Sequence, residues 1–202
     1  MNSASRAWIG ADPGGAGCFG ICLLYADGSV TTANVDCADD AVTFVRENLQ
    51  KTPDGAAVDA PLWWSSGRSG DRCADRWLRE RYGLTGGEVQ TANSLRGAAL
   101  VQGVMFVTRM REHYPNVPVT ESHPKALLKV CYGGNWNGFA QRFGVRWDSV
   151  GEHARDAVVG AVAAREGFGG RWPNDLSERR LAGEQDPKSY WLAPINYFWP
   201  EY

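Results

Sequence analysis

The dipeptide Asp27-Gly28 is the feature of this 202-residue chain that most restricts its fold. Asp-Gly between two apolar runs is typical of a two-residue β-hairpin turn, so we expect a strand over 18–25 to return antiparallel over 29–35. Another apolar run, over 7–12, precedes this hairpin and is separated from it by the glycine-rich turn 13–17. The chain is therefore expected to begin with three consecutive strands.

After these strands the pattern changes to alternating helices and strands. Helices are expected where apolar residues recur at helical spacing or where a helix-start residue occurs, and strands where short apolar runs end in an acid. Two of the predicted helices begin near Asp39 and Asp40 and near Pro124, and three others cover 71–82, 94–114 and 149–166. The predicted strands cover 56–59 and 117–121. Residues 133–147 are expected to be irregular.

Two hairpin-linked strands followed by right-handed crossovers predict a specific sheet. The first and fourth strands become parallel neighbours, which gives an α/β fold with a mixed five-stranded sheet of order 3-2-1-4-5 and helices on both faces. We expect residues 1–202 to form one domain, with a core over about 7–166 and a tail over 168–202, rich in Trp and Pro, that packs on it.

Composition narrows the cellular setting. The net charge is −2, apolar residues make up 44% of the chain, and no apolar run approaches the length of a membrane span. The five cysteines are an odd number without paired metal-ligand spacing, and the polar start lacks the layout of a secretory signal. These observations predict a cytoplasmic protein with reduced cysteines and no membrane association.

Acidic residues follow three of the predicted strands. Asp12, Asp59 and Glu121 each come after a short apolar run, and in open α/β sheets ligands bind outside the carboxyl ends of the strands. Adjacent strands lie about 4.8 Å apart, so Asp12 and Asp59 are expected to point into one small volume. Two anions this close repel each other, and a divalent cation is the usual remedy.

The last helix adds more acids to the same edge. Asp156 shares a helix face with Val159, Gly160 and Ala163, which are small enough to let the helix lie close to the sheet, and Glu152 is one turn away. A single strand-end Asp is more often a turn former than a ligand. Acids that one topology gathers at one edge favour a divalent-metal site instead, with the candidate ligands Asp12, Asp59, Glu121, Asp156 and Glu152, which could serve in place of Asp156.

Five short motifs occur in an order that resembles a known family of predicted nucleases with a ribonuclease H-like fold, domain of unknown function 429. The resemblance covers about 7–166 and not the tail. The motifs are Ile-Gly-Ala-Asp-Pro-Gly-Gly (9–15), Val-Asp-Ala-Pro-Leu (58–62), Arg-Cys-Ala-Asp-Arg (72–76), Glu-Ser-His-Pro (121–124) and Asp-Ala-Val-Val-Gly-Ala-Val-Ala-Ala (156–164).

The resemblance implies a ribonuclease H-like fold and a metal-dependent nuclease that acts on nucleic acid. Asp12, Asp59 and Asp156 would take the places of the catalytic, metal-binding acids of such enzymes. The implied reaction is phosphodiester hydrolysis with two Mg²⁺ or Mn²⁺ ions about 3.5–4 Å apart. Glu121 would be a further ligand or support one, and His153 and His123 are candidates to carry protons.

Basic and aromatic residues near 63–79 suggest a substrate-binding strip. Arginines at helical spacing can bind successive phosphates, and an exposed indole can stack on a base. The alternative is structural: Asp75 can pair internally with the arginines and pin the loop, and Trp63 can pack in the core. The candidate substrate-binding residues are Arg68, Arg72, Arg76, Arg79 and Trp63.

Two rival functions stay open at this point. The turn over 13–17 also looks like the phosphate loop of the actin and sugar-kinase fold, although those proteins need two lobes and this chain has length for one. A non-catalytic interaction module is the other alternative. It would bind a partner, or a second copy in a dimer, through tail aromatics such as Trp191, Tyr197, Phe198 and Trp199, which would equally suit a tail folded over the core.

Overall fold

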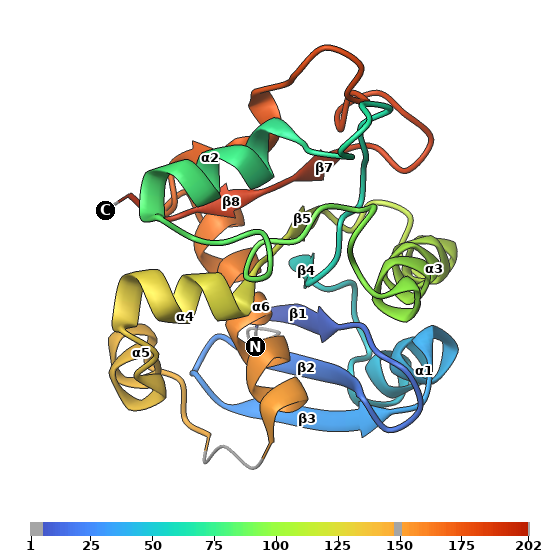
Figure 1. Cartoon of the computed structure of the whole chain (residues 1–202). Coiled ribbons are helices and arrows are strands. Elements are labelled where there is room, and N and C mark those ends of the chain that lie inside the picture. The colour runs from blue at the N-terminus through green and yellow to red at the C-terminus, as the bar shows by residue number, and fades with distance from the viewer. Residues whose placement is uncertain (1–5, 148–150, 202) are drawn as a thin grey trace.

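A computed structural model describes residues 6–147 and 151–201 of the chain (Figure 1). Among these residues, no helix is long and apolar enough to cross a lipid bilayer. The strands are β1 (Ala7–Asp12), β2 (Phe19–Tyr25), β3 (Val30–Val35), β4 (Gly55–Val58), β5 (Val119–Glu121), β6 (Asn174–Asp175), β7 (Ile195–Asn196) and β8 (Phe198–Trp199). The helices are α1 (Ala38–Asn48), α2 (Cys73–Tyr82), α3 (Gly97–His113), α4 (Pro124–Tyr132), α5 (Trp136–Phe143) and α6 (Glu152–Phe168), with a short 3₁₀ helix over Leu176–Glu178.

The main sheet has the order β3-β2-β1-β4-β5-β7. β1, β2 and β3 are antiparallel neighbours, and β1, β4 and β5 are parallel, so the predicted 3-2-1-4-5 order is confirmed. The Asp27-Gly28 turn joins β2 to β3, with Gly28 at φ +86°, a left-handed conformation that glycine adopts readily. This combination of order and strand directions is that of the ribonuclease H-like fold.

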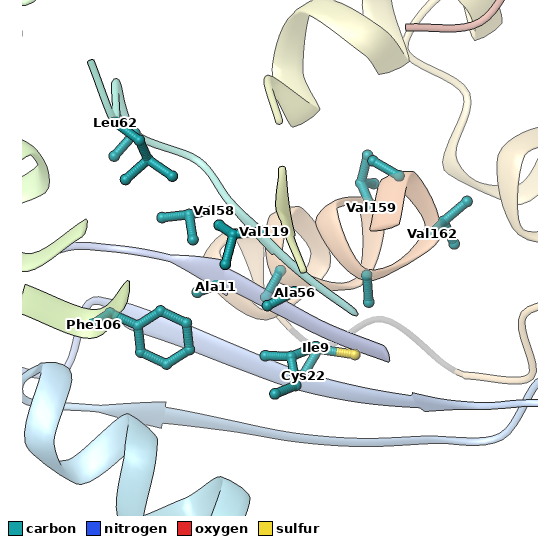
Figure 2. Packing of buried hydrophobic residues seen from close by; sticks show 14 of the residues in the cluster. Ile9, Ala11, Cys22, Ala56, Val58, Leu62, Phe106, Val119, Val159 and Val162 are labelled. Carbon is teal, nitrogen blue, oxygen red and sulfur yellow. The ribbon is translucent and has the colours of Figure 1, made fainter. Parts of the chain in front are cut away.

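The two faces of the sheet are covered by different helices. Phe19 of β2 contacts Phe106 of α3, with ring centroids 5.8 Å apart. The odd-numbered residues of β1 and β2 therefore face α3 and α1. The opposite face, formed by even-numbered residues of β1 and β2 and odd-numbered residues of β4, packs against α6. Figure 2 shows apolar side chains of the core, among them Ile9, Val58 and Val119 from the sheet and Val159 and Val162 from α6.

Glycines let α6 approach the sheet closely. A Cβ atom built on Gly10 would lie 1.8 Å from the Ala157 carbonyl oxygen, and one built on Gly20 would lie 2.2 Å from the His153 carbonyl oxygen. Both contacts are with backbone, which cannot turn aside as a side chain can. The spacing of α6 from β1 and β2 therefore depends on having no side chain at these two positions.

We expect Gly10→Ala to lower the free energy of unfolding by about 2 kcal/mol, because the added methyl group must push α6 away from β1. Urea denaturation monitored by circular dichroism measures the change. Gly15→Ala is the matched control, since its Cβ would meet no atom within 4 Å. Equal stability of the Gly10 variant and the wild type would contradict the close approach of α6.

The prediction of five strands was incomplete, because the tail supplies a sixth. Ile195 of β7 pairs with Val119 of β5 in parallel register, while β6 and β8 form a separate antiparallel pair. Tyr197 and Trp199 are buried, each 1% exposed, which removes them as anchors for an external partner, whereas Trp191 is 64% exposed. A two-residue strand has too little pattern to be recognised from sequence.

The prediction of irregular structure over 133–147 was wrong where α5 lies. Its start is capped by Asn135, whose side chain accepts a hydrogen bond from the Gly138 amide, and it ends at Gly144, which is left-handed at φ +62°. Phe139 is buried on the inner face of this eight-residue helix. The expected start of the last helix near Ser149 lies outside the described residues.

Candidate active site

Three aspartates from separate elements converge at the carboxyl edge of the sheet. Asp12 ends β1, Asp59 directly follows β4, and Asp156 lies in the first half of α6. The Asp59 amide donates to the Ala11 carbonyl at 2.9 Å, which continues the parallel register and sets Asp59 beside Asp12. Both lie on the sheet face that α6 covers, and a hydrogen bond joins their side chains.

Because the three aspartates lie close together and away from water, ionising their carboxyl groups is unfavourable. Burial, followed by the charge of Asp59, raises the pKa of Asp12 to about 8, although a hydrogen bond with His153 opposes the shift. Burial and the charge of Asp156 raise the pKa of Asp59 as well. Burial also raises the pKa of Asp156, against the opposing effect of Arg155. Without a further cation, the site therefore favours the protonated, neutral forms of these carboxyl groups.

Two oxygen atoms beside this cluster are buried without a hydrogen-bond partner in the described part of the chain: Asp156 Oδ2 and Ser122 Oγ. A Cβ atom built on Gly160, one helical turn beyond Asp156, would lie 3.2 Å from Ser122 Oγ, so both oxygens belong to the contact between α6 and the sheet edge. A buried acceptor without a partner is costly unless a ligand satisfies it.

The donor atoms suit a hard divalent cation, because Mg²⁺ and Mn²⁺ prefer carboxylate oxygens. Within residues 6–147 and 151–201, no three His, Cys, Asp or Glu side chains already stand in a metal-binding arrangement. The site carboxylates are instead held by protein groups: His153 Nδ1 lies 2.7 Å from Asp12 Oδ2, and Arg155 donates twice to Asp156 Oδ1. The chemistry of the donors and the unpartnered Asp156 Oδ2 both fit such an ion.

A cavity of about 690 Å³ opens above the aspartates. Asp12 and Asp59 line it, whereas Asp156 is only 1% exposed and is not one of the lining residues. Six acids and three permanent cations contribute to the wall, so the wall is acidic overall. The acids are Asp12, Asp59, Asp75, Glu88, Glu121 and Glu152, and the cations are Arg72, Arg96 and Lys125.

Glu152 and Lys125 form an ion pair at the mouth of this cavity, with Lys125 Nζ 2.7 Å from Glu152 Oε1. Both side chains are more than half exposed, so the pair adds little to stability. Lys125 lines the cavity, and its charge opposes the rise in the pKa of Asp59. Its position in the first turn after Pro124 carries no sequence signal for this role.

Glu121 faces away from the aspartate cluster. It pairs in register with Val58, so it points to the opposite face of the sheet from Asp59, and the following residue, Ser122, faces α6. Glu121 Oε1 accepts hydrogen bonds from the Leu62 amide and from Arg72, whose Nη1 lies 2.6 Å away. Burial raises the pKa of Glu121 to about 7, although Arg72 opposes this shift.

The structure contradicts a phosphate-binding role for Arg72. Its side chain is 3% exposed and is held by Glu121, by the Trp63 carbonyl at 3.2 Å, and by both oxygens of Asp75. The structural alternative was right for this residue, because Arg72 pins the loop internally. The residues next to Arg72 in sequence do not indicate that its partner is Glu121, 49 residues away.

We expect Arg72→Met to lower the free energy of unfolding by about 3 kcal/mol, because Glu121 and Asp75 would lose their cation while remaining buried. Urea denaturation at pH 7 measures this loss. The exposed Arg76 on the same helix provides the control variant, Arg76→Met. A loss of the same size in both variants would contradict a special role for the buried pair.

The other proposed substrate-binding residues do not form a continuous strip. Trp63 is fully buried, which excludes stacking on a base. The predicted substrate-binding role was wrong because the indole packs against Tyr197 and Arg72 instead. Arg79 donates to Asp71 and to the Val89 carbonyl. Arg68 and Arg76 are exposed, but neither lines the cavity.

His153 and His123, the candidate proton carriers, have different surroundings. His153 lies on the cavity wall with a side chain 39% exposed, in contact with Asp12. His123 also lines the cavity, but its Nε2 is 2.9 Å from the Glu88 carbonyl oxygen, and burial lowers its pKa. His153 is therefore the histidine with direct access to the aspartates.

Comparison with known proteins identifies no family. No protein-family model and no curated protein matches the chain. A structure of Thermus thermophilus RuvC in complex with a Holliday junction substrate superimposes with a TM-score of 0.46 at 12% identity, covering 83% of this chain and 96% of that one. A second Thermus thermophilus RuvC structure gives 0.42 at 13% identity, covering 82% and 96%. The chain is thus distant from both in sequence.

Proposed function

We propose that this protein is a metal-dependent nuclease that hydrolyses phosphodiester bonds, with Mg²⁺ or Mn²⁺ bound by Asp12, Asp59 and Asp156. One observation carries the proposal: the carboxyl groups of Asp12, Asp59 and Asp156 meet beside an acidic cavity, where burial raises the pKa of each. A divalent cation would neutralise them and would satisfy Asp156 Oδ2.

A cation would be needed at this wall once the carboxyl groups of Asp12 and Asp59 are ionised. A phosphodiester would be repelled by the carboxylates unless positive charge separated it from them. When bound, divalent ions in such a site lower the pKa of an attacking water and stabilise the leaving oxygen. Glu152, at the mouth of the cavity, would be an outer ligand rather than part of the central set, because it is exposed and paired with Lys125.

The protein's own residues would then orient and exchange protons. His153 holds the Asp12 carboxylate in place at 2.7 Å and is exposed enough to exchange a proton with solvent. Lys125 would contact a substrate phosphate from the cavity mouth once the acidic wall is neutralised. Glu121 would act through the loop that follows Asp59 rather than as a metal ligand, because its carboxylate is bound by Arg72.

The motifs that resemble domain of unknown function 429 support this proposal by their position. Asp12, Asp59 and Asp156 each lie in one of the motifs, and the motif over 72–76 supplies Arg72 and Asp75, which contact Glu121 directly or through each other. We infer that the chain is related to that family.

Calorimetric titration of the wild type with Mn²⁺ and Mg²⁺ tests the metal site. Incubation with labelled single-stranded and duplex DNA and RNA, with and without EDTA, then tests hydrolysis. Saturable binding together with EDTA-sensitive cleavage is the expected result. A folded wild type that binds neither ion, with or without an oligonucleotide present, would contradict the proposal.

A further inference from the structure

The tail holds the loop that follows Asp59. Residues 181–185, here called the strap, lie beside the loop over 63–73 (Figure 1, upper right). The Ser66 amide and hydroxyl both lie 2.9 Å from the Gly183 carbonyl oxygen, and the Gln185 amide donates to the Trp64 carbonyl at 3.0 Å. These segments are more than 110 residues apart in sequence, so only the folded tail brings them together.

Glu184 of the strap fastens both ends of this loop with one carboxylate. Its Oε1 accepts from the Trp63 indole Nε1 at 2.7 Å, and its Oε2 accepts from the Cys73 amide at 2.9 Å. The Leu181 amide, 3.0 Å from Oε2, fixes the carboxylate within the strap. Cys73 is the first residue of α2, where a negative charge is favourable beside the free amides of a helix start.

Both fastened ends connect to Glu121 through Arg72, which contacts Trp63 and directly precedes Cys73. The Trp63 carbonyl accepts from Arg72 Nη1 at 3.2 Å, and the Arg72 guanidinium lies 4.2 Å from the centre of the Trp63 ring. Arg72 in turn binds Glu121, and so does the Leu62 amide, three residues after Asp59. The segment leaving Asp59 is thus held from one side by Glu121 and from the other by Glu184.

We propose that Glu184 is a positioning residue of the candidate active site, which sets the arrangement of Glu121 and Asp59 through Trp63 and Arg72. The inference rests on the proposed function for its effect on metal binding. It assigns a role to the tail, which lies outside the stretch that resembles the nuclease family. Glu184 touches none of the three aspartates by hydrogen bond, so its influence passes through the loop alone.

The test compares Glu184→Ala and Glu184→Gln with the wild type and with Glu178→Ala, which removes an exposed acid from the same tail. The Gln variant keeps the volume of Glu184 but sets an NH₂ group against amide donors, so it serves if the Ala variant fails to fold. Amide hydrogen exchange of 62–73, measured without metal, reports on the loop, and Mn²⁺ titration reports on the site.

We expect both Glu184 variants to speed exchange of the Leu62 and Cys73 amides about tenfold and to weaken Mn²⁺ binding about tenfold, as loss of a supporting group typically does. The Glu178 variant should change neither value. Unchanged Leu62 exchange would overturn the inference, and so would faster exchange with unchanged Mn²⁺ affinity.

The same experiment separates this inference from the proposed function. If the wild type binds no Mn²⁺ while Glu184→Gln still speeds exchange at Leu62, the metal proposal fails. The coupling of Glu184 to Glu121 is then supported, because the Leu62 amide binds Glu121 and not Glu184.

Discussion

Asp12→Asn is expected to weaken Mn²⁺ binding by more than about 100-fold and to reduce hydrolysis of nucleic acid at least as much. The substitution keeps size and shape but removes the charge that lies beside Asp59 and Asp156. Loss of groups that only support metal ligands already costs about 10–100-fold in affinity, so loss of a central ligand should exceed that range. Calorimetry gives the affinity, and cleavage of a labelled oligonucleotide gives the rate.

The control for this variant is Asp39→Asn, since Asp39 is an exposed acid on α1 that pairs with Arg109. It should bind Mn²⁺ as the wild type does. A folded Asp12→Asn protein with wild-type affinity would show that the metal, if bound, lies elsewhere. Asp59→Asn and Asp156→Asn extend the test to the other two elements of the site.

The second large effect concerns the protein without metal. We expect its free energy of unfolding to fall as the pH rises from about 4 to about 8, by on the order of 5 kcal/mol, the value for one carboxyl group with such a shift. Asp12 keeps its proton in the folded protein up to a pKa of about 8, whereas the unfolded chain releases it near pH 4. Above pH 4 the unfolded state therefore binds fewer protons than the folded state. Rising pH then stabilises the unfolded state relative to the folded one.

Urea denaturation in EDTA at pH 5, 6, 7 and 8 measures this slope. The pKa values of Asp59, Asp156 and Glu121 are also raised, so these groups act in the same direction. Glu166 and Asp175 have lowered pKa values and lose their contribution only as the pH falls below about 4, outside this window.

Two comparisons make the pH prediction specific to the site. Asp12→Asn should flatten the slope and should be more stable than the metal-free wild type at pH 8. Addition of Mg²⁺ should stabilise the wild type most at pH 8, because the cation replaces the protons. A metal-free wild type whose stability rises between pH 5 and pH 8 would contradict the raised pKa values.

The sequence determined the order of the sheet and the meeting of Asp12 with Asp59. Both follow from local signals: the Asp27-Gly28 turn fixes the first hairpin, and an acid at the end of each of two short apolar runs reaches the same edge once the strands are parallel neighbours. The period of helix α6 likewise sets Asp156 on the face with Gly160. Information of this kind lies within a few residues, so pattern alone carries it.

Only the tertiary structure decided the partners of the groups around those acids. Glu121 follows an apolar run as Asp12 and Asp59 do, yet its register against Val58 turns it away from them and toward Arg72. By sequence alone, Trp63 and Arg72 were as suited to binding nucleic acid as to internal packing. In the structure Tyr197 and Glu184, both from the tail, cover the Trp63 indole. Such choices depend on burial and on residues 49 to more than 100 positions away, because a buried charge or indole N–H needs a partner that only the completed fold can bring to it.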